Sequence, residues 1–221
     1  MIKPFDKTQD LRAVIFDLDG LLIDSEPAWA TATRILLKKL GVDYHGELRE
    51  QMIGRGQREC AEIYIKHYKL KESVEDFAQK RWKVLYSFLE KNLKLMPGAK
   101  NLIRELSANN LALALATAGH QKKKAKKILQ KFFLGDFFKI IISGLDVPRG
   151  KPFPHIYFFC AQKLDVSPSQ CLVLEDSPNG VIAGKRAGMT VYGVNKDREL
   201  REKMNDAGAD KVFHSLTEIE L

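Results

Sequence analysis

The sequence predicts an α/β fold, with a doubly wound, Rossmann-like parallel sheet as the core and an inserted α-helical cap. Short apolar runs closed by turn residues alternate with helical patterns along most of the chain, as buried parallel strands alternate with crossover helices. Residues 26–94 have only helical patterns and break this alternation. At roughly 150 residues per domain, the 221 residues leave room for a core and a smaller insert. We therefore expect a core of residues 1–25 and 95–221 and a cap of residues 26–94.

Each expected element has its own pattern. Six apolar runs are expected as strands, at residues 12–16, 111–116, 137–142, 171–174, 190–194 and 211–213. Helical patterns of the core lie at residues 102–106, 121–132, 154–164 and 179–187, and those of the cap at 29–40, 47–52, 58–67 and 74–89. Open α/β sheets place their active sites at the carboxyl ends of the strands, and we expect the cap to cover that edge.

Composition narrows the class of protein. Apolar residues make up 45% and charged residues 29%, which favours a globular chain over a disordered one. The 36 Lys and Arg against 28 Asp and Glu give a net charge of +8, so nucleic acid, a membrane surface and phosphorylated metabolites are all candidate partners. No signal-peptide pattern or membrane-length apolar run is seen, and Cys60, Cys160 and Cys171 lack disulfide or zinc spacing. A cytoplasmic protein is expected.

Carboxylates follow two of the expected strands directly. Asp17 and Asp19 come after the first strand, and Glu175 and Asp176 come after the fourth. A polar turn would explain the first pair alone, but the ends of neighbouring parallel strands meet at one edge of a sheet. Negative charges gathered there destabilise the fold unless a cation or a proton neutralises them. An oxygen-rich pocket of this kind suits Mg²⁺, and no cluster of His and Cys favours a softer metal.

Two further strand ends complete a candidate phosphate site. Thr117 ends the second strand and offers a hydroxyl together with the backbone N–H groups of Ala118 and Gly119, which could bind an anion. Lys151 lies between turn residues after the third strand, and its ammonium group could neutralise phosphate charge.

Four segments together resemble the haloacid dehalogenase-like hydrolase superfamily. They are residues 16–25 (FDLDGLLIDS), 116–118 (ATA), 150–154 (GKPFP) and 174–180 (LEDSPNG). Their order and gaps are similar to the branch with a helical cap after the first strand, which contains β-phosphoglucomutase-like enzymes and small sugar-phosphate or nucleotide phosphatases. The resemblance implies a Mg²⁺-dependent phosphatase that hydrolyses a small phosphomonoester, a sugar phosphate or a nucleotide.

The resemblance also implies a catalytic role for each acid. Asp17 would be the nucleophile that forms an aspartyl-phosphate intermediate, and Asp19 would be the general acid and then the general base. Mg²⁺ would be held by Asp17, Asp19 through its backbone carbonyl, Asp176, and Glu175 directly or through water.

The remaining roles implied by the resemblance concern the substrate. Thr117, the backbone N–H of Ala118 and Lys151 would hold the transferring phosphoryl oxygens. In the cap, Arg58 matches a position that often meets the far end of a substrate, and Glu26 would face the active site across the hinge. A solvated helix start for Arg58 and a helix-capping role for Glu26 are the simpler alternatives.

Three positions weigh on the alternatives. Mutases of the branch have a cap histidine where this sequence has Trp29, which weakens the alternative of a phosphosugar mutase. His155 stands where members of the branch usually have an acidic residue. We expect this replacement to affect the stability of the protein and not its chemistry. The basic run of residues 122–127 leaves a remote alternative, a non-catalytic protein that binds nucleic acid or another anion, although a solvated face is its simpler interpretation. We expect a monomer that acts on a small phosphorylated metabolite, without nucleic acid or membrane partners.

Overall fold

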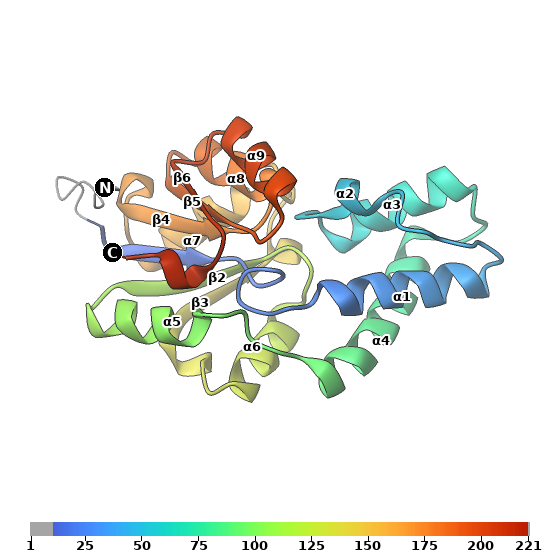
Figure 1. Ribbon diagram of the computed structural model, residues 1–221, viewed down its shortest axis with the longest axis horizontal. Coiled ribbons are helices and arrows are strands. Elements are labelled where there is room, and N and C mark those ends of the chain that lie inside the picture. Colours follow the sequence, from blue (N-terminus) through green and yellow to red (C-terminus); the bar gives the residue numbers. More distant parts are fainter. Residues whose placement is uncertain (1–10, 221) are drawn as a thin grey trace.

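The computed structural model describes residues 11–220 and confirms the α/β fold (Figure 1). Six parallel strands form one sheet in the order β3-β2-β1-β4-β5-β6. They are β1 (Ala13–Phe16), β2 (Ala112–Thr117), β3 (Phe138–Ser143), β4 (Cys171–Glu175), β5 (Thr190–Val194) and β6 (Lys211–Phe213). Each lies within two residues of its predicted position.

Helices cover both faces of the sheet, as its sequence pattern requires. The core helices are α5 (Ala99–Ala108), α6 (Lys122–Lys131), α7 (His155–Leu164), α8 (Pro178–Arg186) and α9 (Arg198–Asp206). Successive strand residues point to opposite faces. Val14 and Phe16 therefore pack in a cluster with side chains of α5 and α6. Ala13 and Ile15 pack in another cluster with side chains of α7 and α8.

The register of the central strands brings their carboxyl ends level. Phe16 of β1 pairs with Leu115 of β2 on one side and with Leu174 of β4 on the other. The chain leaves these strands close to Asp17, Thr117 and Glu175. The predicted meeting of the strand ends at one edge of the sheet is therefore correct.

Residues 26–92 form four helices that lie together on one side of the molecule (Figure 1). They are α1 (Glu26–Lys39), α2 (Arg49–Met52), α3 (Gln57–Tyr68) and α4 (Val74–Asn92). These helices, the cap helices below, have an apolar cluster of their own that includes Leu36, Tyr64 and Phe77. Within the described residues, no helix has both the length and the apolar character that a membrane crossing needs.

Two chain segments connect the cap helices to the sheet, and they are hydrogen-bonded to each other. The N–H of Asp24 donates to the carbonyl of Lys94 at 3.0 Å, and the N–H of Met96 donates to the carbonyl of Leu22 at 2.9 Å. Ile23 and Leu95 form an isolated antiparallel bridge between them. This paired connection lies at the boundaries that the sequence suggested for the cap. The division into a core of residues 1–25 and 95–221 and a cap of residues 26–94 stays a prediction.

Two differences from the predicted helices have clear causes. The first cap helix begins at Glu26 rather than at residue 29, because Pro27 lies in its first turn, where proline is tolerated. Helix α9 was absent from the prediction. Its sequence is highly polar, and only Leu200 and Met204 are buried, so its apolar pattern is weak.

Candidate active site

Lys151 connects the ends of β1 and β4. Its Nζ donates to Asp17 Oδ1 and to Glu175 Oε1, both at 2.5 Å, and to the carbonyl of Ala116 at 3.3 Å. All three charged side chains are buried, and the Asp17 residue is 6% exposed. Burial alone would lower the pKa of Lys151, but the two carboxylates raise it well above its usual range, so this lysine is charged.

The carboxylates around Asp17 bring more negative charge than the single positive charge of Lys151 neutralises. The pKa of Asp17 is raised to about 7: burial is the largest cause, the charge of Lys151 opposes it, and the charges of Glu175 and Asp19 add to it. Within the described residues, only Oδ1 of Asp17 accepts hydrogen bonds, and Asp17 lines a cavity. Its Oδ2 is therefore available to a ligand.

Glu175 does not line that cavity, and both of its carboxylate oxygens accept hydrogen bonds from the protein, so its expected role as a metal ligand, directly or through water, stays a prediction. Its Oε1 accepts from Lys151 and from the Tyr157 hydroxyl at 2.6 Å, and its Oε2 accepts from Asp176 N–H at 3.0 Å and from the Ser177 hydroxyl at 3.0 Å. A Cβ at position 180 would overlap the Glu175 carboxyl, so glycine is needed there. These contacts hold Lys151 and the loop after β4 in place.

Asp176 lies against the loop that follows β1. A Cβ at Gly20 would overlap the Asp176 carboxylate, and Gly20 has a φ of +79° that side chains disfavour. The backbone carbonyl of Asp176 accepts from Asn195 at 2.9 Å. Burial raises the pKa of Asp176 well above its usual range, and the charges of Asp17 and Glu175 add to the shift.

Of the four acids that the sequence places at the strand ends, Asp17, Asp19 and Asp176 line the cavity. In residues 11–220 no three His, Cys, Asp or Glu side chains are grouped to hold a metal ion. Two buried carboxylates, Asp17 and Asp176, remain near the same loop with raised pKa values. Mg²⁺ is commonly bound by one or two carboxylates and keeps several waters, so this smaller donor set still suits it.

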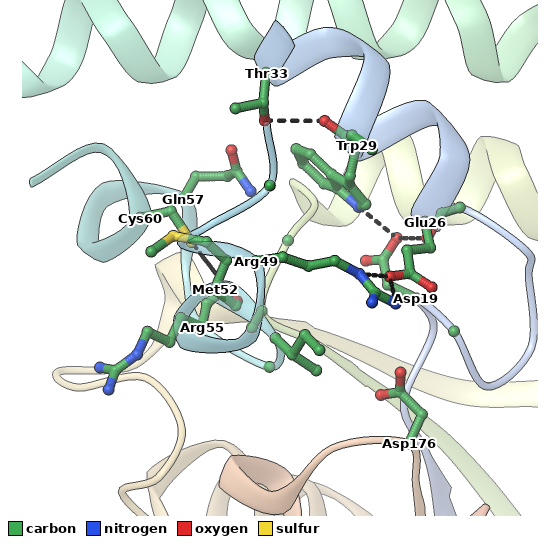
Figure 2. A pocket seen from close by; sticks show the side chains of 18 of the residues that line it. Asp19, Glu26, Trp29, Thr33, Arg49, Met52, Arg55, Gln57, Cys60 and Asp176 are labelled. Atoms are coloured by element: carbon green, nitrogen blue, oxygen red, sulfur yellow. Dashed lines mark hydrogen bonds and ion pairs between the residues drawn. The ribbon is translucent and has the colours of Figure 1, made fainter. Parts of the chain in front are cut away.

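Asp19 is held through one carboxylate oxygen by three donors. Its Oδ1 contacts Ser25 Oγ at 2.6 Å, Trp29 Nε1 at 3.1 Å and His120 Nε2 at 3.0 Å. Figure 2 shows the Trp29 indole, which comes from α1, directed at Asp19. Burial raises the pKa of Asp19, but His120, Ser25 and Trp29 outweigh it and lower the pKa overall.

His120 is a site residue that the sequence reasoning missed. Its side chain is fully buried, and its Nδ1 lies 3.0 Å from the hydroxyl of Tyr86 in α4. Ser143 Oγ donates to its backbone carbonyl at 2.7 Å. The position of His120, three residues after Thr117 at a strand end, could have revealed it. Tyr86 lies 34 residues earlier and carries no local signal.

Thr117 remains a candidate for phosphate binding. Its Oγ1 is buried and, among the described residues, is one of two buried side-chain polar atoms without a hydrogen-bond partner. The chain then passes close to Asp19, because a Cβ at Gly119 would lie 2.8 Å from Asp19 Oδ2. Ala118 and Gly119 both line the cavity with Asp17 and Asp19, and anion binding by their backbone N–H groups stays a prediction.

The cavity has a volume of about 320 Å³ and lies between the strand ends and the cap helices. On the cap side, Glu26 lines it and pairs with Arg49, as Figure 2 shows. Arg58 is not among the lining residues. Its side chain is 71% exposed and pairs with Glu62 and Glu75. This position fits the simpler interpretation, a solvated helix start, and the expected contact of Arg58 with a substrate stays a prediction.

The structure brings a neighbour of Arg58 into the cavity instead. Gln57 is 7% exposed and lines the cavity. Neighbouring residues of a helix point about 100° apart, so a shift of one position exchanges an outward side chain for an inward one. The glycine-containing stretch before α3 does not indicate which of these two neighbouring side chains faces the cavity.

The basic run of residues 122–127 and His155 do not line the cavity. The lysines of the basic run lie on α6 and are mostly exposed, and Lys124 Nζ packs 4.5 Å from the centre of the Tyr86 ring. His155 begins α7, where its Nδ1 lies 3.3 Å from the carbonyl of Arg149.

The chain is similar to known proteins over most of its length. The model of the haloacid dehalogenase-like hydrolase family matches residues 14–194. A Drosophila melanogaster protein named "probable pseudouridine-5'-phosphatase" is 37% identical over 93% of this chain and 90% of its own. A "phosphorylated carbohydrates phosphatase" of Thermotoga maritima is 32% identical over 90% of this chain and 92% of its own. The crystal structure of a β-phosphoglucomutase from Clostridium difficile, 26% identical, superposes with a TM-score of 0.84 over 96% of this chain and 94% of its own.

Proposed function

Because the chain belongs to the haloacid dehalogenase-like hydrolase family, we propose that it is a Mg²⁺-dependent phosphatase that hydrolyses a small phosphomonoester, a sugar phosphate or a nucleotide. The observation that carries the proposal is Asp17. It is a buried carboxylate at a strand end, with Lys151 on Oδ1 and Oδ2 available to the cavity. Two similar proteins are named as phosphatases of small phosphate esters, which supports the same class of substrate.

The residues around Asp17 suit phosphoryl transfer in two steps. Asp17 Oδ2 attacks the phosphorus atom, the bond from phosphorus to the ester oxygen breaks, and the alcohol leaves with a proton while an aspartyl phosphate forms. Water then attacks the aspartyl phosphate, which releases inorganic phosphate and restores the carboxylate. Lys151 fixes the orientation of Asp17 through Oδ1. The unpartnered Thr117 hydroxyl and the backbone N–H of Ala118 are the candidate donors to the phosphoryl oxygens.

Asp19 fits the proton transfers of both steps. All three of its donors bind Oδ1, so Oδ2 is the oxygen that carries the proton given to the leaving group. The lowered pKa of Asp19 favours its carboxylate form, which is the form that accepts a proton from water in the second step.

Asp17, Asp176 and the backbone carbonyl of Asp19 are the groups that would hold Mg²⁺. The ion would supply positive charge against the phosphoryl oxygens and reduce their repulsion from Asp17. Glu175 would act indirectly, by holding Lys151. Because one chain supplies every group around the cavity, we expect a monomer, and the three free, buried cysteines fit the reducing cytoplasm.

A screen for phosphate release tests the proposal. Sugar phosphates and nucleotides are supplied to the enzyme with Mg²⁺ or with a chelator. We expect release from at least one ester, its loss with the chelator, and its loss in Asp17→Asn. Release that persists in the chelator or in Asp17→Asn would contradict the mechanism, and no release from any ester would contradict the activity.

A phosphosugar mutase is the second candidate, favoured by the close superposition on a β-phosphoglucomutase. The Trp29 indole on Asp19 weighs against it, because indole has no second nitrogen with which to move a proton on a bound sugar. A mutase would convert a sugar 1-phosphate to the 6-phosphate with a bisphosphate primer, whereas a phosphatase would release inorganic phosphate. Analysis of the products by phosphorus NMR separates the two.

A further inference from the structure

Arg81 of α4 is a buried cation with neutral partners. The residue is 4% exposed. Its Nε donates to Thr33 Oγ1 at 2.8 Å and its Nη1 donates to Gln57 Oε1 at 3.0 Å. The guanidinium carbon lies 4.7 Å from the centre of the Trp29 ring and 5.5 Å from that of Tyr64. Within residues 11–220, no carboxylate forms an ion pair with it.

This arrangement differs from that of three other arginines in the cap. Arg49 pairs with Glu26, Arg55 with Glu59, and Arg58 with Glu62 and Glu75, although all of them are more exposed than Arg81. A buried charge without a counterion is costly, and neutral hydrogen-bond partners and aromatic faces recover only part of that cost. The position therefore favours a counterion that comes from outside the chain.

The cavity gives such a counterion access to Arg81. Arg81 lines the cavity together with its two partners, Thr33 and Gln57, which Figure 2 shows above Asp19 and Asp176. Asp17 and Asp176 line the opposite, core side. The cavity therefore has the candidate phosphoryl site at its core end and a buried positive charge at its cap end.

We propose that Arg81 binds a second anionic group of the substrate, a carboxylate or a second phosphate, at the end remote from the phosphoryl group that Asp17 attacks. This inference rests on the proposed function and narrows its substrate class. A volume of about 320 Å³ lies at the low end of the usual range for ligand sites, so the substrate is a small doubly anionic metabolite.

Matched substrate pairs test the proposal in the wild-type enzyme. Glycerate 3-phosphate and glycerol 3-phosphate differ only in a carboxylate against a hydroxymethyl group, and fructose 1,6-bisphosphate and fructose 6-phosphate differ in the second phosphate. We expect kcat/KM to be roughly 10- to 100-fold higher for the doubly anionic member of at least one pair, mainly through KM. The pair that shows the preference identifies the anion.

Variants assign the preference to Arg81. Arg81→Gln is expected to lose it while still hydrolysing the singly anionic ester. Lys80→Gln, which removes one positive charge from an exposed position of the same helix, is expected to keep it. Circular dichroism and thermal melting establish whether Arg81→Gln is folded. If it does not fold, inhibition of the wild-type enzyme by glycerate against glycerol provides the same comparison, with glycerate expected to inhibit at lower concentration.

The outcomes separate this inference from the proposed function. Equal kcat/KM within both pairs, equal inhibition by glycerate and glycerol, or a preference that survives in folded Arg81→Gln would overturn the role of Arg81 while leaving the phosphatase intact. Failure to release phosphate from any ester would instead overturn the proposed function.

Discussion

At the scale of single residues, Lys151 has the most demanding position, since it lies between two buried carboxylates. Lys151→Met would leave Asp17 and Glu175 without a counterion, and breaking a buried pair in this way costs about 3–5 kcal/mol. We expect a lower free energy of unfolding in urea, with the loss larger at pH 8 than at pH 5, because protonation relieves the carboxylates at low pH. Lys185→Met, which breaks a more exposed pair with Asp210, is the control. An equal loss in both variants would contradict the prediction.

His120 links Asp19 to the cap through Tyr86. His120→Ala would free Asp19 to leave its present orientation, so proton transfer should suffer more than substrate binding. We expect kcat to fall by roughly 100-fold or more, as for a misplaced general acid, with a nearly unchanged KM. Tyr86→Phe removes only the second link, and a smaller decrease is expected. A raised KM with unchanged kcat in His120→Ala would show that the histidine binds substrate instead.

At the scale of elements, the local sequence patterns predicted the parts of the site that belong to strand ends. Asp17, Thr117 and Glu175 each follow or end an apolar run, and the parallel register brings them together. The direction of a side chain was harder to predict. Glu175 faces Lys151 because donors from α7 and from the loop after β4 surround it, and those contacts depend on packing rather than on spacing.

The side chains that the cap helices bring to the site were even harder to predict from the sequence. Trp29, Tyr86 and Arg81 come from two helices that are far apart in the sequence, and they reach the site only after α1 packs against α4. No local motif marks them. Arg58 and Gln57 differ by one position, so a small error in helical phase was enough to select the exposed residue.

The loop after β1 offers a matched pair of glycine substitutions. Gly20 and Gly41 both have a φ of +79°, but a Cβ at Gly20 would overlap Asp176, whereas nothing lies within 4 Å of a Cβ at Gly41. Gly41→Ala should cost about 1 kcal/mol through backbone strain alone. Gly20→Ala should cost more and should also abolish most phosphatase activity, because Asp176 has to move. Thermal melting and phosphate release measure both, and equal effects would contradict the placement of Asp176.

At the scale of the whole molecule, the paired connection between the cap helices and the sheet allows both to share one site. The Asp19–His120–Tyr86 contacts and the Trp82 Nε1 bond to the Gly119 carbonyl, at 2.8 Å, cross from the cap helices to the core. They lie beside the cavity rather than at the outer surface. The position of the cap is therefore coupled to the orientation of Asp19.

The raised pKa values of Asp17, to about 7, and of Asp176 make the stability of the whole fold depend on pH and on metal. Unfolded aspartates release their protons near pH 4, whereas the folded, metal-free protein retains them to higher pH. The folded state thus binds more protons than the unfolded state between about pH 4 and pH 7. Metal-free stability should fall as pH rises through the window set by Asp17, and deprotonation of Asp176 adds to the loss.

Mg²⁺ should reverse this loss, because it binds the deprotonated carboxylates and replaces the missing positive charge. We expect the increase in melting temperature on addition of Mg²⁺ to be larger at pH 8 than at pH 5.5, where protons compete with the ion. Asp176→Asn, which removes one negative charge with little change in shape, should raise the metal-free melting temperature at pH 8 and abolish most of the Mg²⁺ effect. If the increase in melting temperature caused by Mg²⁺ does not depend on pH, or if Asp176→Asn leaves that increase unchanged, the ion binds elsewhere.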